Sequence, residues 1–355
     1  MSKHSTLIKP PKALPHHSPM ESVLSLLRLT DIEPDLFTNA RPLWHPPGAR
    51  GIFGGAAIAQ CLSAAQATIP PDFTVHSMHC YFVLAGDSSI PVLYHVERVR
   101  DGRSFITRTV QARQRGRPIF TTTLSFVKEK SGGNVKAEHF VPMPTDVRLP
   151  ITKPGEPHTK KVHNWIRARG RISDHPTRDF PPGDPSTTTT TNNNNDDDEP
   201  QHTDNHQAHL SALAYMSDSY FIGSVARVHN IPRISSARTI ERALAAFKGS
   251  VDEKEEMRAY LERLAAEDAE ELALTGGADD GRRIGMMVSL DHSIYFHNPR
   301  SFRADEWMLA EVNSPWAGDG RGLVIQRIWS KDGILIATCI QEGLVRLNQT
   351  RQHKI

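Results

Sequence analysis

The chain has 355 residues, which is enough for two domains, or one large domain, with a substantial core. Its 42 Lys and Arg residues nearly balance its 40 Asp and Glu residues, and the formal charge of +2 argues against a nucleic-acid-binding protein. A hydrophobic fraction of only 38% predicts that some polar segment is unfolded.

Residues 1–20 carry basic residues and prolines but no continuous apolar core, so we expect a flexible arm rather than a secretory signal or an anchor. The most apolar stretch, 54–69, is interrupted by Gln60 and Gln66 and is too short to span a bilayer, so we expect no membrane insertion. The three cysteines lie far apart without CxxC spacing, which argues against a disulfide framework or a bound metal.

An internal repeat organises most of the chain. Residues 102–127 and 320–345 both begin with Gly-Arg, run as a long strand, turn at Gly116 or Gly333, and return as a second strand. The matching upstream strands are 76–83 and 92–99 in the first copy, and 287–299 and 306–313 in the second. A period far above 50 residues indicates a duplicated domain rather than a solenoid.

Each copy also carries an apolar helix ahead of its strands. The first, 56–68, is rich in small residues that allow close packing on a sheet, and the second, 208–228, places its apolar residues on one stripe. A strand at 163–172 precedes the second helix. The order of strand, helix and four antiparallel strands, found twice, predicts an α+β fold in which each curved sheet wraps around a central helix.

Composition sets the domain boundaries. We expect an N-terminal domain at 21–129, a Pro, Gly and Lys-rich linker at 130–159, a C-terminal domain at 160–350 and a tail at 351–355. Two insertions interrupt the C-terminal domain. The low-complexity segment 184–206 cannot bury enough apolar surface to become ordered. The segment 235–283 predicts one or two amphipathic surface helices.

Two polar residues lie in apolar surroundings. Asp218 interrupts an apolar helix, where an acid needs hydrogen-bond donors or water at a cleft, although many such acids only face solvent. Gln341 shares its strand face with Leu335, Ala337 and Cys339, which is also typical of an amide that reaches a backbone partner. Asp291 and His292 are adjacent on a strand and therefore point to opposite faces.

Several ordered motifs resemble those of the acyl-CoA thioesterase II family, the double-hotdog enzymes of bacteria and peroxisomes. They are GIFGG at 51–55, HSMHCYF at 76–82, VRDGRSF at 99–105, LDHSIYFH at 290–297 and QEG at 341–343. The resemblance covers roughly residues 24–346 apart from the insertions. It implies that Asp218, Ser289 and Gln341 hold the hydrolytic water. Several relatives have Thr where this chain has Ser289, but the hydroxyl is kept.

Thioester hydrolysis fits these residues chemically. Asp218 would act as general base, and Ser289 and Gln341 would orient the water. Either backbone N–H groups near a helix start or the Gln341 amide would face the oxyanion. Neither a covalent step nor a cofactor is required, and GxSxG is absent. We expect the substrate-binding residues to include Phe53, Gly54, Gly55 and His292. The first copy lacks the acid and the amide, which favours a structural and ligand-binding half.

The leading hypothesis is therefore an acyl-CoA thioesterase that releases a fatty acid and coenzyme A. The alternatives are a catalytically silent acyl-CoA-binding or scaffold protein and, ranked last, an enoyl-CoA hydratase. Alternating arginines at 98–117 offer a basic sheet surface for the phosphates of coenzyme A, or only a solvated face. By analogy we expect a homo-oligomer. The end His353-Lys354-Ile355 resembles a degenerate peroxisomal address, so we expect a peroxisomal or cytoplasmic protein.

Overall fold

The computed structural model describes residues 17–46, 49, 51–145, 147, 155–175, 204–219, 221–232, 237–247, 251–274 and 280–348. The predicted tail at 351–355 lies outside these residues, as does the low-complexity insertion except for 204–206. Of the predicted flexible arm, only 17–20 are described, and they are not loose. Helix α1 (Pro19–Leu24) begins there because Ser18 and Glu21 form a reciprocal capping box, and Met20 is buried.

The first repeat places short strands before its helix and long strands after it. Strands β1 (Leu26–Arg28) and β2 (Leu36–Asn39) lead to helix α2 (Gly54–Gln66). Four antiparallel strands follow, namely β3 (Phe73–Phe82), β4 (Leu93–Asp101), β5 (Phe105–Gln114) and β6 (Arg117–Lys128). The predicted turn between β5 and β6 lies at Arg115 and Gly116, both with positive φ.

The second repeat follows the same plan. The turn η1 (Pro157–Thr159) and strand β7 (Lys161–Ile166) precede helices α3 (His206–Ser217) and α4 (Gly223–Val228). Its remaining strands are β8 (Ile284–Ser289), β9 (Asp291–Phe296), β10 (Met308–Gly318), β11 (Arg321–Trp329) and β12 (Leu335–Leu347). The α+β fold with two copies of one unit is confirmed.

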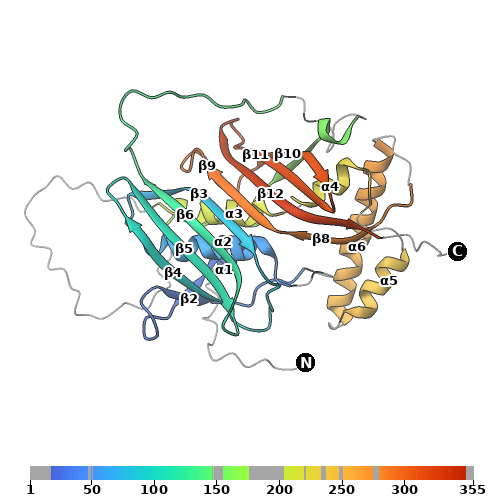
Figure 1. The fold of residues 1–355 in the computed structure, drawn as a ribbon, viewed down its shortest axis with the longest axis horizontal. Helices are drawn as coiled ribbons and strands as arrows, with labels where there is room; N and C mark the ends of the chain where they lie inside the picture. Colours follow the sequence, from blue (N-terminus) through green and yellow to red (C-terminus); the bar gives the residue numbers. More distant parts are fainter. Residues whose placement is uncertain are drawn as a thin grey trace, which may run out of the picture.

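The two repeats share one continuous sheet. Its strand order is β1-β2-β4-β5-β6-β3-β9-β12-β11-β10-β7, with β8 also paired to β12. The seam is the antiparallel pair β3 and β9, in which Cys80 lies opposite His292 (Figure 1). Helices α2 and α3 pack against each other, with Ser63 Oγ donating to Ser211 Oγ at 3.0 Å. Small side chains allow this close approach, so one hydrophobic core runs through both repeats.

The predicted helical insertion forms helices α5 (Ala237–Ala246) and α6 (Val251–Leu274), which lie beside the second repeat (Figure 1). They bury a small cluster of their own, made of Ile240, Leu244, Met257 and Leu261. The amphipathic spacing in the sequence therefore predicted this element correctly.

Three predicted elements differ from the structure. The helix expected at 208–228 is two helices, because the run Ser217-Asp218-Ser219 offers side-chain hydrogen bonds that compete with the helical backbone. The strand expected at 163–172 ends at Ile166, and the chain leaves the sheet and turns at Gly170, whose φ is +81°. The strand expected at 287–299 is broken at Leu290, which separates β8 from β9.

Candidate active site

Asp218 occupies the C-cap of α3 rather than the interior of a helix. Its side chain crosses to the other repeat, where the carboxylate accepts a hydrogen bond from the backbone N–H of Gly55 in the first turn of α2. The N-cap residue of α2, Phe53, makes no side-chain capping bond. The acid of one repeat thus lies at the positive end of the other repeat's central helix.

The two glycines at the start of α2 permit this approach. A Cβ atom on Gly54 would lie 2.6 Å from Asp218 Oδ2, and a Cβ atom on Gly55 would lie 2.2 Å from the carbonyl oxygen of Tyr215. A larger residue at Gly54 would displace the side chains of Asp218 and Phe82, and one at Gly55 would displace the backbone at Tyr215. Phe53 packs its ring edge-on to Tyr215 at a centroid distance of 4.9 Å. The FGG motif therefore brings the start of α2 against the end of α3.

Gln341 and His292 are completely buried on the inner face of the sheet, next to Asp218. Gln341 Nε2 donates to Asp218 Oδ1 at 2.8 Å and lies 3.2 Å from His292 Nδ1. His292 Nε2 lies 2.9 Å from Ser217 Oγ, which donates to the carbonyl oxygen of Ala214. The ring of Phe221 covers the imidazole edge-on. The strand alternation in the sequence predicted the inner position of Gln341 correctly.

Ser289 reaches the same face through a bulge. It lies opposite Gly343 on β12, while Ser293 lies opposite Ile340, so the β8–β9 segment holds one residue more than β12 over this interval. The bulge places Ser289 and His292 on one face although they are three residues apart. Ser289 is then a diagonal neighbour of Gln341, at a spacing of about 7–8 Å between such positions. A hydroxyl there can share a small molecule with the amide.

Burial sets the protonation states of this cluster. Desolvation raises the pKa of the Asp218 carboxyl from 3.8 to about 6, although the hydrogen bonds from Gln341 and Gly55 pull it down. Desolvation lowers the pKa of His292 to about 3, so the imidazole is neutral at physiological pH. Burial raises the pKa of the neighbouring Cys80 thiol to about 12. A carboxylate with a pKa near 6 is suited to take a proton at neutral pH.

At the end of its central helix the first repeat has Ala67 instead of an acid, and a buried cation from β5 lies close by. Arg108 is fully buried and donates to Thr68 Oγ1 at 2.9 Å and to the Thr68 carbonyl oxygen at 3.1 Å, just beyond the end of α2. It also pairs with Asp101. A cation is favourable at the C-terminus of a helix. Arg108 is therefore not part of the basic surface expected at 98–117.

Sequence reasoning missed two members of the cluster. Ser217 lies inside the single helix predicted at 208–228, and its bond to His292 arises because α3 ends there. Gly55 was expected only to approach substrate, whereas its N–H holds Asp218. Only the adjacency of Ser217 to Asp218 could have signalled the first, and nothing local signals the second.

Comparison with known proteins agrees with the fold. Two family models match the chain, "Acyl-CoA thioesterase N-terminal domain" over residues 41–127 and "Acyl-CoA thioesterase C-terminal domain" over residues 123–345. Acyl-coenzyme A thioesterase 8 of Rattus norvegicus is 33% identical over 331 residues, which cover 91% of this chain and 88% of the relative. Acyl-CoA thioesterase 2 of Haemophilus influenzae is 27% identical, and the match covers 93% of this chain and 99% of the relative.

A solved structure of an acyl-CoA thioesterase is also similar to this chain over nearly its whole length. The acyl-CoA thioesterase II TesB2 of Mycobacterium marinum has a TM-score of 0.60 and 27% identity, and the match covers 94% of this chain and 99% of that one. The duplicated sheet and helix arrangement places the protein in the double-hotdog class. Within that class, the chain belongs to the acyl-CoA thioesterase II family, and it is an acyl-CoA thioester hydrolase. In the described part of the chain no helix is long and apolar enough to cross a membrane.

Proposed function

We propose that the protein hydrolyses fatty acyl-CoA with a water molecule that Asp218 deprotonates and that Gln341 and Ser289 orient. The observation that carries this proposal is the hydrogen bond from Gln341 Nε2 to Asp218 Oδ1, at 2.8 Å. The pKa of this same Asp218 carboxyl is near 6. General base catalysis of this kind contributes roughly 10²- to 10⁴-fold to the rate.

Hydrogen-bond logic fixes the orientation of the Gln341 amide. An ionised Asp218 can only accept, so the NH₂ group of Gln341 faces it, and the second N–H of that group points to His292 Nδ1. Gln341 Oε1 is buried and has no hydrogen-bond partner among the described residues. It is thus the group that accepts a hydrogen bond from one O–H of the nucleophilic water, while Asp218 takes the proton of the other O–H.

His292 then acts as a positioning residue instead of the substrate contact expected from the sequence. Because Nδ1 accepts from Gln341, the neutral ring carries its proton on Nε2 and donates it to Ser217 Oγ. The Ser217 hydroxyl in turn donates a hydrogen bond to the Ala214 carbonyl oxygen. Both ring nitrogens are therefore occupied, and the chain of bonds holds Gln341 with its oxygen turned to the water.

The oxyanion needs other donors, because both N–H bonds of the Gln341 amide are in use. At the start of α2 the Phe53 N–H donates to the Trp44 carbonyl oxygen at 3.0 Å and the Gly55 N–H donates to Asp218. This leaves the Gly54 N–H, which lies at the positive end of that helix and next to Asp218. We assign the substrate carbonyl to this position. Of the expected substrate-binding residues Phe53, Gly54 and Gly55, Gly54 would then contact the substrate through its backbone N–H, while Gly55 holds Asp218.

Thiol release from acyl-CoA tests this mechanism directly. Asp218→Asn and Gln341→Ala should each lower kcat by at least about 10²-fold, with acyl-CoA binding retained. Asp291→Asn is the matched control, because Asp291 faces away from the cluster and accepts from the backbone N–H of Glu342. Near-normal turnover in Asp218→Asn would remove Asp218 from the mechanism. Saturable binding without thiol release by the wild type would favour the silent acyl-CoA-binding alternative.

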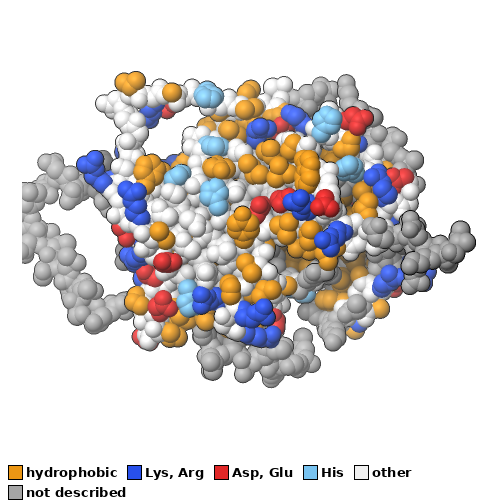
Figure 2. All heavy atoms as spheres, viewed as in Figure 1, with side chains coloured by type: hydrophobic (Ala, Val, Ile, Leu, Met, Phe, Trp, Pro, Cys, Tyr) orange, Lys and Arg blue, Asp and Glu red, His pale blue; other side chains and the backbone are white. Residues whose placement is uncertain are grey.

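Assembly and location complete the proposal. We propose a homo-oligomer that uses the outer face of the sheet, where Tyr81, Phe105 and Tyr295 are exposed near the seam. Figure 2 shows hydrophobic side chains and histidines on this face.

We also propose a peroxisomal or cytoplasmic location. Support comes from a yeast relative named "Peroxisomal acyl-coenzyme A thioester hydrolase 1", which is 33% identical over 125 residues and matches 35% of this chain.

A further inference from the structure

A groove with a volume of about 810 Å³ opens beside the end of α3. Its walls are the end of β7 with the loop that follows it, from Trp165 to Arg171, and the segment from Arg303 to Trp307 that precedes β10. Met216 and Ser219 line it as well, and these residues flank Asp218 in the chain. The groove is therefore adjacent to the candidate active site but separate from the buried cluster of Gln341 and His292.

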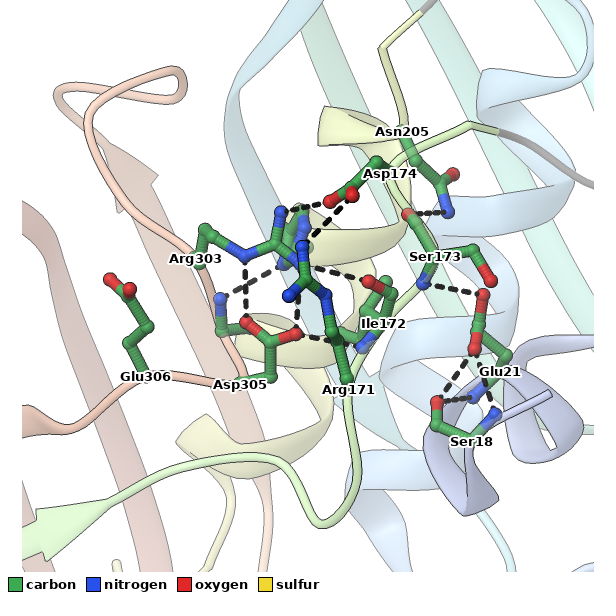
Figure 3. A network of polar contacts seen from close by, with 12 residues as sticks. Ser18, Glu21, Arg171, Ile172, Ser173, Asp174, Asn205, Arg303, Asp305 and Glu306 are labelled. Carbon is green, nitrogen blue, oxygen red and sulfur yellow. Dashed lines mark hydrogen bonds and ion pairs between the residues drawn. The ribbon is translucent and has the colours of Figure 1, made fainter. Parts of the chain in front are cut away.

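One wall of the groove is fixed by ion pairs and backbone bonds (Figure 3). Arg303 binds both carboxylate oxygens of Asp305, at 3.0 and 2.9 Å, and also reaches Asp174 at 2.7 Å and the carbonyl oxygen of Ile172 at 2.8 Å. The backbone N–H of Ile172 donates to Asp305 at 2.7 Å. Arg171 pairs with Asp174 as well. Arg171 and Arg303 are thus already neutralised by the ion pairs that hold the loop in place.

Two other arginines of the groove have no such partners. Arg167 and Arg169 are exposed and form no ion pair with any residue that the structure describes. The Arg167 guanidinium lies 4.5 Å from the centre of the Trp307 ring, which orients it. Trp165 and Trp307 are 48% and 49% exposed, which is high for so large an apolar side chain. Two unpaired guanidinium groups and two open indoles suit a ligand that combines phosphates with an aromatic base.

We propose that this groove binds the adenosine 3′,5′-bisphosphate end of coenzyme A, with Arg167 and Arg169 on the phosphates and an indole against the adenine. The inference rests on the proposed function and names where that substrate is held. The pantetheine arm separates the nucleotide from the thioester, so a nucleotide site beside Asp218, and not at it, matches the shape of the substrate. Within the basic surface expected at 98–117, two arginines are less suited to bind phosphates. Arg98 is paired with Asp35, and Arg108 is buried.

The test compares two substrates in one variant. Arg167→Gln/Arg169→Gln should raise KM for acyl-CoA about tenfold or more, since hydrogen bonds to charged groups contribute about 1.5–3 kcal/mol each. Its kcat should stay unchanged. Hydrolysis of the same acyl group on pantetheine, which lacks the nucleotide, should be equal in variant and wild type. Arg103→Gln/Arg117→Gln, an identical charge change on the exposed surface of the first repeat, should leave both substrates unaffected.

Direct binding of 3′,5′-ADP separates this inference from the catalytic proposal. Titration of the wild type should show binding that the Arg167→Gln/Arg169→Gln variant loses and the Arg103→Gln/Arg117→Gln variant keeps, whether or not thiol is released. Equal KM values for acyl-CoA in variant and wild type would overturn the inference. So would an equal loss for acyl-CoA and acyl-pantetheine, or 3′,5′-ADP binding that survives in the groove variant. Failure of thiol release by the wild type would instead overturn the proposed function.

Discussion

Replacement of Asp218 by Asn should stabilise the fold while it removes activity. The carboxylate is held in a site that desolvates it, which is why its pKa rises from 3.8 to about 6. Above pH 6 the folded protein carries this charge against that preference. The neutral amide of Asn has about the same size and removes the cost of burying a charge, so the proposed general base works against stability.

The magnitude follows from the pKa. A rise from 3.8 to about 6 corresponds to on the order of 3 kcal/mol of lost unfolding free energy whenever the carboxyl is ionised. This cost is fully present above the folded pKa and disappears below the unfolded one, where the group is protonated in both states. Asn gives up the bond from the Gly55 N–H, worth about 1 kcal/mol. The net gain at pH 8 should be about 2 kcal/mol.

Urea unfolding of wild type and Asp218→Asn at pH 8 and near pH 4 measures this difference, and contributions of the other titratable groups cancel between the two proteins. The variant should be more stable at pH 8, and its advantage should begin to shrink as the pH falls below 6 and be gone near pH 4. A variant less stable than the wild type at pH 8, or a difference independent of pH, would show that Asp218 is not strained by burial.

Gln341→Leu should raise the pKa of Asp218 further, because it removes a donor worth about 1.5–3 kcal/mol to the charged form; the acidic limb of the kcat/KM profile, near pH 6 in the wild type, should move to about pH 7–8 in thiol-release assays. Gly55→Ala should abolish activity and lower the melting temperature, because the new methyl group would lie 2.2 Å from the Tyr215 carbonyl oxygen. Arg108→Leu should lower the free energy of unfolding by about 2–4 kcal/mol, measured in urea, without changing kcat.

Matched controls accompany these variants. Gly132→Ala adds a methyl group whose nearest neighbour is Lys136 Cε at 3.9 Å, so both its activity and its melting temperature should equal those of the wild type. Arg103→Leu removes an exposed arginine of the same repeat and should leave stability unchanged. An unshifted pH profile in Gln341→Leu, or unaltered stability in Arg108→Leu, would contradict the contacts from which the expectations derive.

Much of the fold could be predicted because it follows from local sequence patterns. The duplicated strand pairs, the small residues of α2 and the amphipathic spacing of α5 and α6 each depend on neighbours close in sequence. Strand alternation was also enough to predict that the Gln341 side chain points inward. The roles of Asp218, Ser289 and Gln341 rested on the resemblance to the family, since neither spacing nor periodicity links residues so far apart in the chain.

The features that sequence reasoning missed depend on contacts between distant segments. The break after Ser217 is stabilised when Asp218 meets the start of α2, a helix about 160 residues earlier in the sequence. The bulge at Leu290 changes which residues share a face, so period-two counting fails across it. The loop after β7 leaves the sheet because Ile172 bonds to Asp305, 133 residues later. Such pairings become visible only in three dimensions.

The contrast between Arg108 and Asp218 bears on why the two units are joined in one polypeptide. If two identical subunits formed this assembly, a single gene would have to encode the ends of both central helices alike, so an acid could not be present at one helix end and absent from the other. Fusion releases the copies from that constraint. One copy can then keep the buried carboxylate of Asp218, which lowers the stability of the fold, while the other copy uses Arg108 to hold the end of its central helix.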